Sequence, residues 1–298
     1  MARKKRTGDA APLRRTCGAM AAHMGLLERF PAFRAHQFLL ERDTARRRTR
    51  EVDLARLKLA TIKVIVHVVY RVPAENISLA QITSQFKVLN RDYAATNADR
   101  AGVPAPWKGL VTDSRIRFKL AKVTRTATAK TSFTWDDGVK KASTGGIPPE
   151  QPDKYLNLWV CALGGGLLGY AQFPGGPATT DGVVISYRAF GTTGAAQAPF
   201  NKGRTATHEI GHYLNLRHIW GDTEDCSGSD NVSDTPNCAG PNYGAPSFPT
   251  ISCNNGPNGD MFMNYMDYVD DAAMFMFTAQ QVLRMRAAIE GLRESLVT

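Results

Sequence analysis

Several features that define simple protein classes are missing from this sequence. Its longest largely apolar stretch, residues 59–70, is shorter than the roughly 18 uninterrupted apolar residues of a membrane-spanning helix, and it contains Lys63 and His67. Glycine and proline, with 26 and 16 residues of 298, follow no collagen-like or low-complexity pattern, and we find no internal repeat. The sequence therefore predicts neither an integral membrane protein nor a fibrous or wholly disordered one. It is long enough for one large core or two smaller ones.

Acidic residues are scarce in the first 50 positions, which we call the leader. The leader has 13 Lys and Arg against 4 Asp and Glu, so it carries +9 of the formal charge of +10, and residues 51–298 carry only +1. Such basicity suggests a nucleic-acid partner, but no aromatic residues interleave with the basic runs and no nucleic-acid-binding motif is present. Between those runs, no apolar stretch is long enough for a signal-peptide core. We therefore expect no nucleic-acid partner and no conventional export signal in these residues.

Cysteine is also scarce. The chain has five cysteines, and because this number is odd at least one lies outside any intrachain disulfide. Cys226, Cys238 and Cys253 fall in a stretch rich in Gly, Pro, Asn and Asp, where a cross-link would help to order a segment with little core. Cys161 lies in an apolar run and is expected to be a buried small hydrophobe. Cys17 stands alone in the leader.

The spacing of apolar residues predicts a sheet followed by a long loop region. Alternation over 62–68 indicates a strand, and spacings of three and four behind Ser78 as N-cap indicate a helix over 79–93. Further strands are expected at 115–123, 155–162 and 182–186, and further helices at 205–214 and from Thr278 to Leu296. The intervening loop region of about 60 residues is unusual in a compact domain unless it is functional or held by ligands and cross-links.

Three of the six histidines fall within eleven residues, at His208, His212 and His218. Positions i and i+4 share one face of a helix, so His208 and His212 can present two imidazole nitrogens to one cation. Glu209 is one step round the helix, close enough to reach a metal-bound water without being a ligand. At this composition His-Glu-x-x-His would arise by chance in about four of every thousand such chains, and the third histidine makes coincidence far rarer.

Three histidine ligands leave one position of a tetrahedral zinc ion open, which is the catalytic arrangement. Water in that position would have its pKa lowered towards about 7, and Glu209 would take its proton and pass it to the leaving amine of a peptide. To reach His218 the chain must turn back, and Asn215 is a residue type that tolerates the left-handed backbone required. The alternative is a non-catalytic, zinc- and calcium-stabilised protein-binding module, against which Glu209 argues.

The motif His-Glu-x-x-His-x-x-Asn-x-x-His at 208–218, with Asn-Tyr-Met-Asp-Tyr at 264–268, resembles the zinc motif and Met-turn of metzincin peptidases. The strings at 166–177, 216–222 and 267–271 resemble the pappalysin and cytophagalysin branch, and the resemblance runs from Cys17 to the final helix. It implies an α+β, metzincin-type zincin fold. A twisted mixed β-sheet with helices would form an upper subdomain of about residues 51–214 that includes the active-site helix. An irregular lower subdomain of about residues 215–298 would end in a C-terminal helix.

The resemblance also assigns roles to residues of the cleft. Met266 would form an apolar base beneath the zinc, and Tyr268 would stabilise the tetrahedral intermediate. An edge strand over 167–171, including Leu168 and Gly169, would pair with the substrate main chain by β-augmentation.

Asp271 stands at the position that, in relatives, lies at the bottom of the S1′ pocket, which receives the residue after the cut bond. Its carboxylate would select Arg or Lys there, since a buried carboxylate needs a cationic partner. The alternative is that Asp270 and Asp271 cap a turn or bind calcium.

The leader resembles the propeptide of these enzymes, in which a cysteine thiolate occupies the open zinc position and keeps the enzyme latent. Cys17 would be that cysteine, and an incidental thiol is the alternative. Residues 1–50 would be the propeptide and residues 51–298 the metallopeptidase domain. The arginine-rich run 46–50 offers bonds to an enzyme that cuts before Arg, so autoprocessing is expected near residues 45–50.

Two further features follow from the resemblance. Cys226 and Cys253 match a family disulfide, which implies an extracellular or envelope setting, whereas Ala245 and Ala273 stand where relatives usually carry a second pair. Cys238 would then be unpaired, unless it bonds differently from the family.

The run 230–235 resembles a calcium loop, with Asp230, Asp234 and Thr235 as the expected ligands, although acidic loops without metal are common. We therefore expect a secreted zinc endopeptidase with protein or peptide substrates, and neither a membrane nor a nucleic-acid partner.

Overall fold

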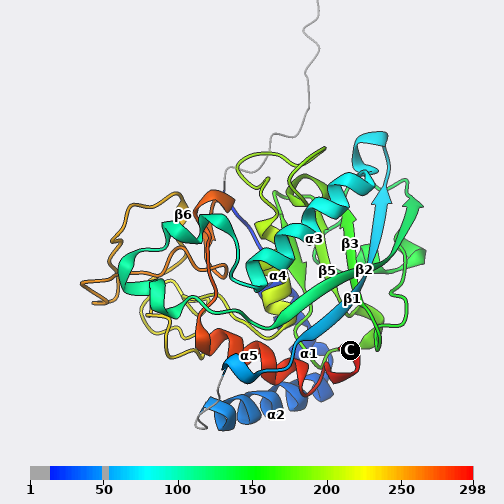
Figure 1. Cartoon of the computed structure of the whole chain (residues 1–298). Helices are drawn as coiled ribbons and strands as arrows, with labels where there is room; N and C mark the ends of the chain where they lie inside the picture. The colour runs from blue at the N-terminus through cyan, green and yellow to red at the C-terminus, as the bar shows by residue number, and fades with distance from the viewer. Residues whose placement is uncertain (1–13, 49–53, 298) are drawn as a thin grey trace, which may run out of the picture.

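The computed structural model describes residues 14–48 and 54–297, and its central element is one five-stranded mixed sheet (Figure 1). The strand order is β2-β1-β3-β5-β4, with parallel neighbours except for β4, which runs antiparallel to β5 at the edge. The strands are β1 (Ala60–Tyr70), β2 (Ile116–Ala127), β3 (Leu156–Cys161), β4 (Gly169–Ala171) and β5 (Val183–Ser186). The predicted mixed sheet and its strands are confirmed, with small shifts at the ends.

Side chains of β3 alternate between two cores, as the period of a buried strand requires. Leu158 and Val160 belong to the main core, which includes residues of α3 (Leu79–Tyr93) and α4 (Arg204–Tyr213). Trp159 and Cys161 belong to a second apolar cluster. Cys161 is fully buried, as its apolar surroundings predicted.

Helix α3 confirms the predicted bounds and supports the helix that carries two histidines. Ser78 caps it by accepting a hydrogen bond from the Gln81 N–H. Near its end, Tyr93 donates from its hydroxyl to the Thr207 carbonyl at 3.1 Å, and Asp92 accepts a hydrogen bond from the Thr207 hydroxyl at 2.7 Å. These contacts tie the middle of α4 to a helix that packs in the same core.

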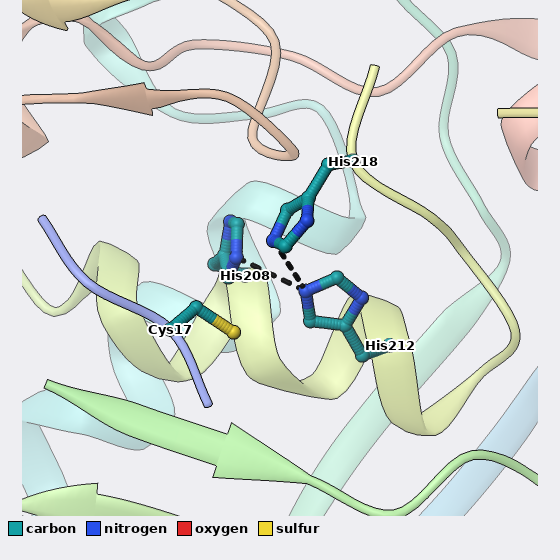
Figure 2. Close-up of side chains that lie close together, drawn as sticks. All are labelled: Cys17, His208, His212 and His218. Atoms are coloured by element: carbon teal, nitrogen blue, oxygen red, sulfur yellow. Dashed lines mark hydrogen bonds between the residues drawn. The ribbon is translucent and has the colours of Figure 1, made fainter. Parts of the chain in front are cut away.

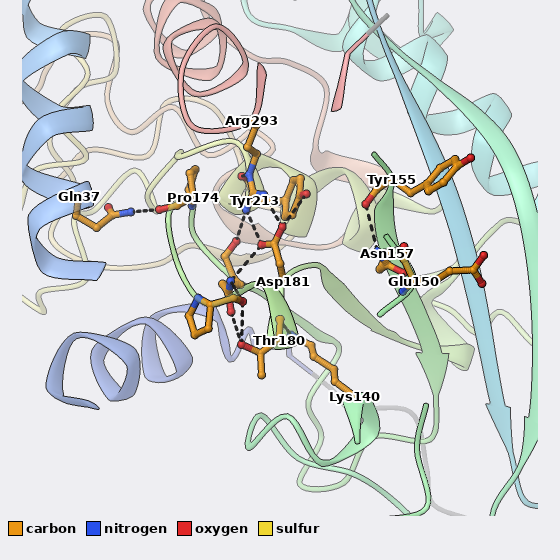
Figure 3. Close-up of polar contacts among 12 residues, drawn as sticks. Gln37, Lys140, Glu150, Tyr155, Asn157, Pro174, Thr180, Asp181, Tyr213 and Arg293 are labelled. Carbon is orange, nitrogen blue, oxygen red and sulfur yellow. Dashed lines mark hydrogen bonds and ion pairs between the residues drawn. The ribbon is translucent and has the colours of Figure 1, made fainter. Parts of the chain in front are cut away.

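Both ends of α4 are held by buried arginines. At its start, Arg204 donates to the Tyr265 hydroxyl at 2.7 Å and to the Met274 carbonyl at 2.9 Å. At its end, the Arg293 guanidinium lies over the Tyr213 ring and forms a bidentate pair with Asp181 (Figure 3). The zinc-motif helix is therefore fixed in both position and direction.

Residues 215–297 contain little regular structure. The two-residue strands β6 (Tyr243–Gly244) and β7 (Tyr268–Val269) pair in parallel, and the main helix is α5 (Ala279–Ile289) with a capping box at Thr278. A disulfide joins Cys226 to Cys253, the pair expected from the resemblance. The remaining thiol in this part, Cys238, is buried.

The closing helix is shorter than predicted. It ends at Ile289, and the Gly291 and Arg293 N–H groups both turn back to the Ala288 carbonyl. Glycine is a weak helix former, which explains the break that apolar spacing alone did not reveal. Leu296 lies instead in a separate short 3-10 turn, Glu294–Leu296.

The leader, expected only as a basic segment, forms two helices, α1 (Ala19–Arg29) and α2 (Pro31–Arg48). Proline at the first position of a helix is favourable because its fixed φ suits the turn and its missing N–H would have no partner there. Helix α2 lies along α5 (Figure 1), and α1 contacts β4. Among the described residues, no helix has the length and apolar character of a membrane span.

Candidate active site

The three histidines of the zinc motif converge on one point (Figure 2). His208 and His212 project from the same face of α4, and the chain then reverses at Asn215, whose φ of +75° confirms the predicted left-handed turn. This reversal brings His218 back, so that Nε2 of His212 lies 3.1 Å from Nε2 of both His208 and His218. All three side chains are buried.

The hydrogen bonds of the opposite ring nitrogens show whether this cluster suits a metal ion. Nδ1 of His208 faces the Tyr265 carbonyl at 2.7 Å, Nδ1 of His212 faces the Leu216 carbonyl at 2.8 Å, and Nδ1 of His218 faces an Asp222 carboxylate oxygen. These are acceptors, so each Nδ1 carries the proton and each Nε2 presents a lone pair. Three converging lone pairs repel one another unless a cation lies between them. The residues therefore fit a zinc ion.

Burial supports the same protonation state. Burial and the neighbouring imidazoles hold the pKa of His208 and of His212 well below the ordinary value. Both rings are therefore neutral at physiological pH, which is the form that binds a metal.

The leader brings a fourth potential ligand to the histidines. The Sγ atom of Cys17 and one nitrogen of each histidine all lie within 4.8 Å of one another (Figure 2), and within 14–48 and 54–297 no other group of three or more His, Cys, Asp or Glu ligand atoms is so placed. Cys17 also lies 3.3 Å from Glu209 Oε2 and accepts a hydrogen bond from the Ala19 N–H. Three imidazoles and one thiolate make a complete tetrahedral set for zinc.

Glu209 lies between the histidines and the edge strand. Its side chain is buried, and this burial raises its pKa to about 8. A Cβ atom added to Gly169 would come 2.8 Å from Glu209 Cγ, so only glycine allows the strand to approach the helix this closely.

The leader pairs with the edge strand that was expected to bind substrate. The Leu168 N–H donates to the Thr16 carbonyl at 3.0 Å, and the Gly18 N–H donates to the Gly169 carbonyl at 2.9 Å. Cys17 and Gly169 thereby form a parallel bridge. Residues 16–18 thus occupy the place of an added strand.

Asp271 and the groups around it, which we call the Asp271 pocket, hold an arginine of the leader. Arg15 Nη2 lies 2.6 Å from Asp271 Oδ1, and both side chains are buried. The same guanidinium donates to the Thr205 hydroxyl and the Val269 carbonyl. The second Asp271 oxygen accepts the backbone N–H groups of residues 202 and 204. Through these two N–H groups Asp271 also caps the turn that leads into α4, which is one of the two roles that the alternative gave it.

The Met-turn packs directly beneath the zinc helix. Met266 is fully buried, and a Cβ atom on Gly211 would come 2.5 Å from its sulfur, so this glycine permits the contact. Tyr268 follows, with its ring centroid 4.9 Å from that of His218 and 5.8 Å from that of His208. The phenol thus stands beside the histidine cluster.

Three residues of the site had no role assigned from the sequence. They are Arg15 in the Asp271 pocket, Asp222 on the Nδ1 atom of His218, and Trp220, whose ring stacks on His218 at 4.4 Å. Asp222 could have been suspected from the chemistry of the site, since a ligand histidine usually donates its second ring N–H to a carboxylate, a carbonyl or water. For Arg15, the only sign in the sequence that it belongs to the site was its position two residues before Cys17.

Of the residues expected to bind calcium, two are in contact. The Thr235 hydroxyl donates to Asp230 at 2.7 Å, and burial raises the pKa of Asp230 to about 7. Asp234 instead accepts hydrogen bonds from the Thr278 hydroxyl and the Gln280 N–H at the start of α5.

Known proteins are similar to this chain in sequence and fold. The peptidase M43 family model, described as pregnancy-associated plasma protein-A, matches residues 150–290. An extracellular metalloprotease of Arthroderma benhamiae is 33% identical over 242 aligned residues, and the match covers 78% of this chain and 79% of that one. An extracellular metalloprotease of Pyricularia oryzae is 34% identical over 249 aligned residues, and the match covers 80% and 78%.

Two solved structures extend the comparison. Tannerella forsythia mature mirolysin in complex with a cleaved peptide is 49% identical, with a TM-score of 0.79, and the match covers 80% of this chain and 96% of that one. A promirolysin mutant of the same organism is 44% identical, with a TM-score of 0.86, and covers 95% and 97%. The predicted α+β zincin fold is thereby confirmed, and the chain belongs to the pappalysin family of zinc metallopeptidases, peptidase M43.

Proposed function

We propose that this chain is the latent precursor of a secreted endopeptidase that cuts peptide bonds before Arg or Lys. The observation that carries the proposal is the path of residues 15–17 through one cleft. Along this path Arg15 pairs with Asp271, and Cys17 lies beside the three histidines. A leader that fills both the expected specificity pocket and the expected zinc position would block every substrate.

The residues around the histidines would carry out the hydrolysis. Zinc bound to His208, His212 and His218 would supply a Lewis acid that polarises the peptide carbonyl and acidifies water. Glu209 would take a proton from the attacking water and return it to the leaving amine. Burial raises the pKa of Tyr268, which keeps its phenol protonated and able to donate to the developing oxyanion.

The preference for a basic residue would come from Asp271. Its carboxylate is buried, so an apolar residue in the same pocket would leave a charge without a cationic partner. The guanidinium of Arg15 fits the pocket with three hydrogen-bonding partners, Asp271, Thr205 and the Val269 carbonyl. An arginine after the cut bond would make the same contacts, while lysine would make fewer.

Latency would end when the enzyme cuts its own leader. Helix α2 continues through Arg46 and Arg47 to Arg48. A peptide bond inside a helix cannot be cut there, because a substrate must be extended to pair with the edge strand. Of the expected autoprocessing bonds, we therefore propose the one before Arg50, which lies outside the described residues. The promirolysin structure covers more of this chain than the mature one does, which supports assigning residues 1–50 to a propeptide and 51–298 to the enzyme.

Calcium and secretion complete the proposal. Asp230 and Thr235 would be calcium ligands, and Asp234 would have to leave the α5 cap to join them. The Cys226–Cys253 disulfide and the extracellular relatives support an oxidising destination. We divide the enzyme after α4 into an upper subdomain of about 51–214 and a lower one of about 215–298.

The test is cleavage of an unfolded protein after the precursor has been incubated to process itself, with cut sites mapped by mass spectrometry. Wild type, Glu209→Ala and the surface control Glu150→Gln would be incubated with and without a zinc chelator. We expect wild type and the control to cut before Arg or Lys, and both the chelator and Glu209→Ala to abolish cleavage. Equal cleavage by Glu209→Ala would reject the mechanism, and cuts without regard to Arg or Lys would reject the specificity.

A further inference from the structure

An aromatic ring lies in the small sheet that precedes Asp271 in the fold. Tyr243 in β6 is the register partner of Tyr268 in β7, and the two ring centroids are 6.1 Å apart. The Asp270 N–H donates to the Gly244 carbonyl at 2.8 Å, which fixes β6 against the segment that carries Asp271. Tyr243 is 37% exposed, so its ring is available to a bound chain.

The leader places a guanidinium over this ring. The Cζ atom of Arg14 lies 4.9 Å from the Tyr243 ring centroid, within the range of a cation–π contact. Its neighbour Arg15 donates from Nε to the Val269 carbonyl in β7. Two successive arginines of the leader therefore contact the two successive strands of this small sheet.

The order of contacts along the cleft shows which substrate residue would meet Tyr243. Starting at the histidines, the leader has Cys17 at the expected zinc position, then Arg15 in the Asp271 pocket, and then Arg14. A substrate has its cut carbonyl at the zinc, its first residue after the cut (P1′) in the Asp271 pocket, and its second (P2′) beyond. Both chains pass the same pockets in the same order outward from the zinc, so Arg14 occupies the region of P2′.

We propose that Tyr243 forms a second cation-binding subsite, which makes the enzyme favour Arg or Lys at P2′ as well as at P1′. This proposal rests on the proposed function, since it takes the Asp271 pocket as S1′. Burial and the nearby carboxyl groups of Asp267 and Glu224 raise the pKa of the Tyr243 hydroxyl against the effect of Arg14, so acidic groups stand close to this ring. A basic pair would then be the preferred substrate signal. At the proposed maturation bond, Glu51 would occupy this subsite, so self-cleavage there would be slower than cleavage before an Arg-Arg pair.

The test uses mature enzyme and peptides with Arg fixed at P1′ and Arg, Lys, Gln or Glu at P2′. We expect wild-type kcat/KM to be about three- to fivefold higher with Arg than with Gln, the size of effect that an exposed cation–π contact supplies. Tyr243→Phe, which keeps the ring, should retain the preference, and Tyr243→Leu should abolish it. Tyr155→Leu, a change at the start of β3, is the matched control and should behave like wild type.

The outcomes separate this proposal from the one on which it rests. A wild-type enzyme with no P2′ preference, or a preference that survives in Tyr243→Leu, would overturn the Tyr243 subsite. Loss of the preference in Glu224→Gln but not in Tyr243→Leu would do the same, because a carboxylate would then bind the cation. A second peptide series that varies P1′ tests the proposed function separately. A wild-type enzyme with no preference for Arg or Lys at P1′ would contradict the proposed function.

Discussion

The two halves of the leader bind the enzyme in different ways. Residues 14–18, which we call the cleft strand, contact groups that the proposed mechanism uses, namely the edge strand, the Asp271 pocket and the histidine cluster. Residues 19–48, which contain α1 and α2, add contacts to β4 and α5 that lie beyond those groups. There Gln37 donates to the Pro174 carbonyl (Figure 3), and Glu41 forms a bidentate pair with Arg284 of α5.

The difference indicates that the cleft strand inhibits the enzyme, whereas the helices α1 and α2 attach the leader to it. The cleft strand imitates a substrate, so a change in the enzyme that weakens it should also weaken substrate binding. The helices make contacts that a short substrate peptide lacks, so their changes should alter leader affinity alone. One contact links the halves, because Arg284 also donates from Nε to the Asn215 carbonyl at 2.6 Å, in the turn that brings His218 back.

The largest expected effect comes from Asp271→Asn. Removing the carboxylate should lower kcat/KM for peptides with Arg at P1′ by about 100-fold, because a buried charge loses its partner. It should also weaken inhibition of the mature enzyme by a peptide of residues 1–48, since Arg15 uses the same carboxylate. Steady-state kinetics and inhibition constants test both effects, with Asp270→Asn as the matched control. If Asp271→Asn lost cleavage but was still fully inhibited by the leader peptide, the idea that the cleft strand imitates a substrate would be contradicted.

The next effect concerns Cys17. Cys17→Ala should speed self-processing of the precursor by about tenfold or more, since the zinc would lose its thiolate ligand while Arg15 and the helices remain. Gel electrophoresis over time measures the rate, and Cys161→Ala, which removes a buried thiol elsewhere, is the control. Unchanged kinetics would assign the block to Arg15 or to the helices.

The same two halves show what the sequence could and could not predict. The zinc motif was predictable because its chemistry depends on local spacing, and the left-handed backbone predicted at Asn215 is present. Assignments such as Cys17 and Asp271 required the family resemblance, since nothing local relates positions so far apart. Arg15 was missed because its partner is known only after folding.

Helix α2 was missed for a physical reason. Its buried positions are Phe33, Gln37, Leu40 and Thr44, which follow helical spacing, but two of them are polar. The Gln37 side chain donates a hydrogen bond to the Pro174 carbonyl, and the Thr44 hydroxyl donates one to the Leu40 carbonyl. Both residues are therefore buried although neither is apolar. Apolar periodicity cannot detect such a stripe.

A smaller effect is expected from Glu41→Gln in the leader peptide. The inhibition constant for mature enzyme should rise about threefold to tenfold, because Arg284 is buried and would lose its bidentate partner while Glu41 itself is partly exposed. P1′ specificity should not change. Glu28→Gln, an exposed carboxylate on α1, is the control and should leave inhibition unaltered. An equal effect from both substitutions would point to net charge and not to the Arg284 contact.

The smallest effect is a pH dependence of leader binding through His23 of α1. This ring packs against Phe33 and Phe173, and burial lowers its pKa from 6.5 to about 4, with Arg217 also disfavouring the charged form and Asp222 and Glu41 opposing it. The free leader therefore binds a proton on His23 below pH 6.5, whereas the bound leader does so only near pH 4. Leader binding is strongest above pH 6.5 and weakens as the pH falls. The inhibition constant should rise about threefold between pH 7 and pH 6, and His23→Phe should flatten this rise whereas His36→Phe should not. If His23→Phe kept the full pH dependence, the acid sensitivity would belong to the cleft strand, and the two halves would differ less than their contacts indicate.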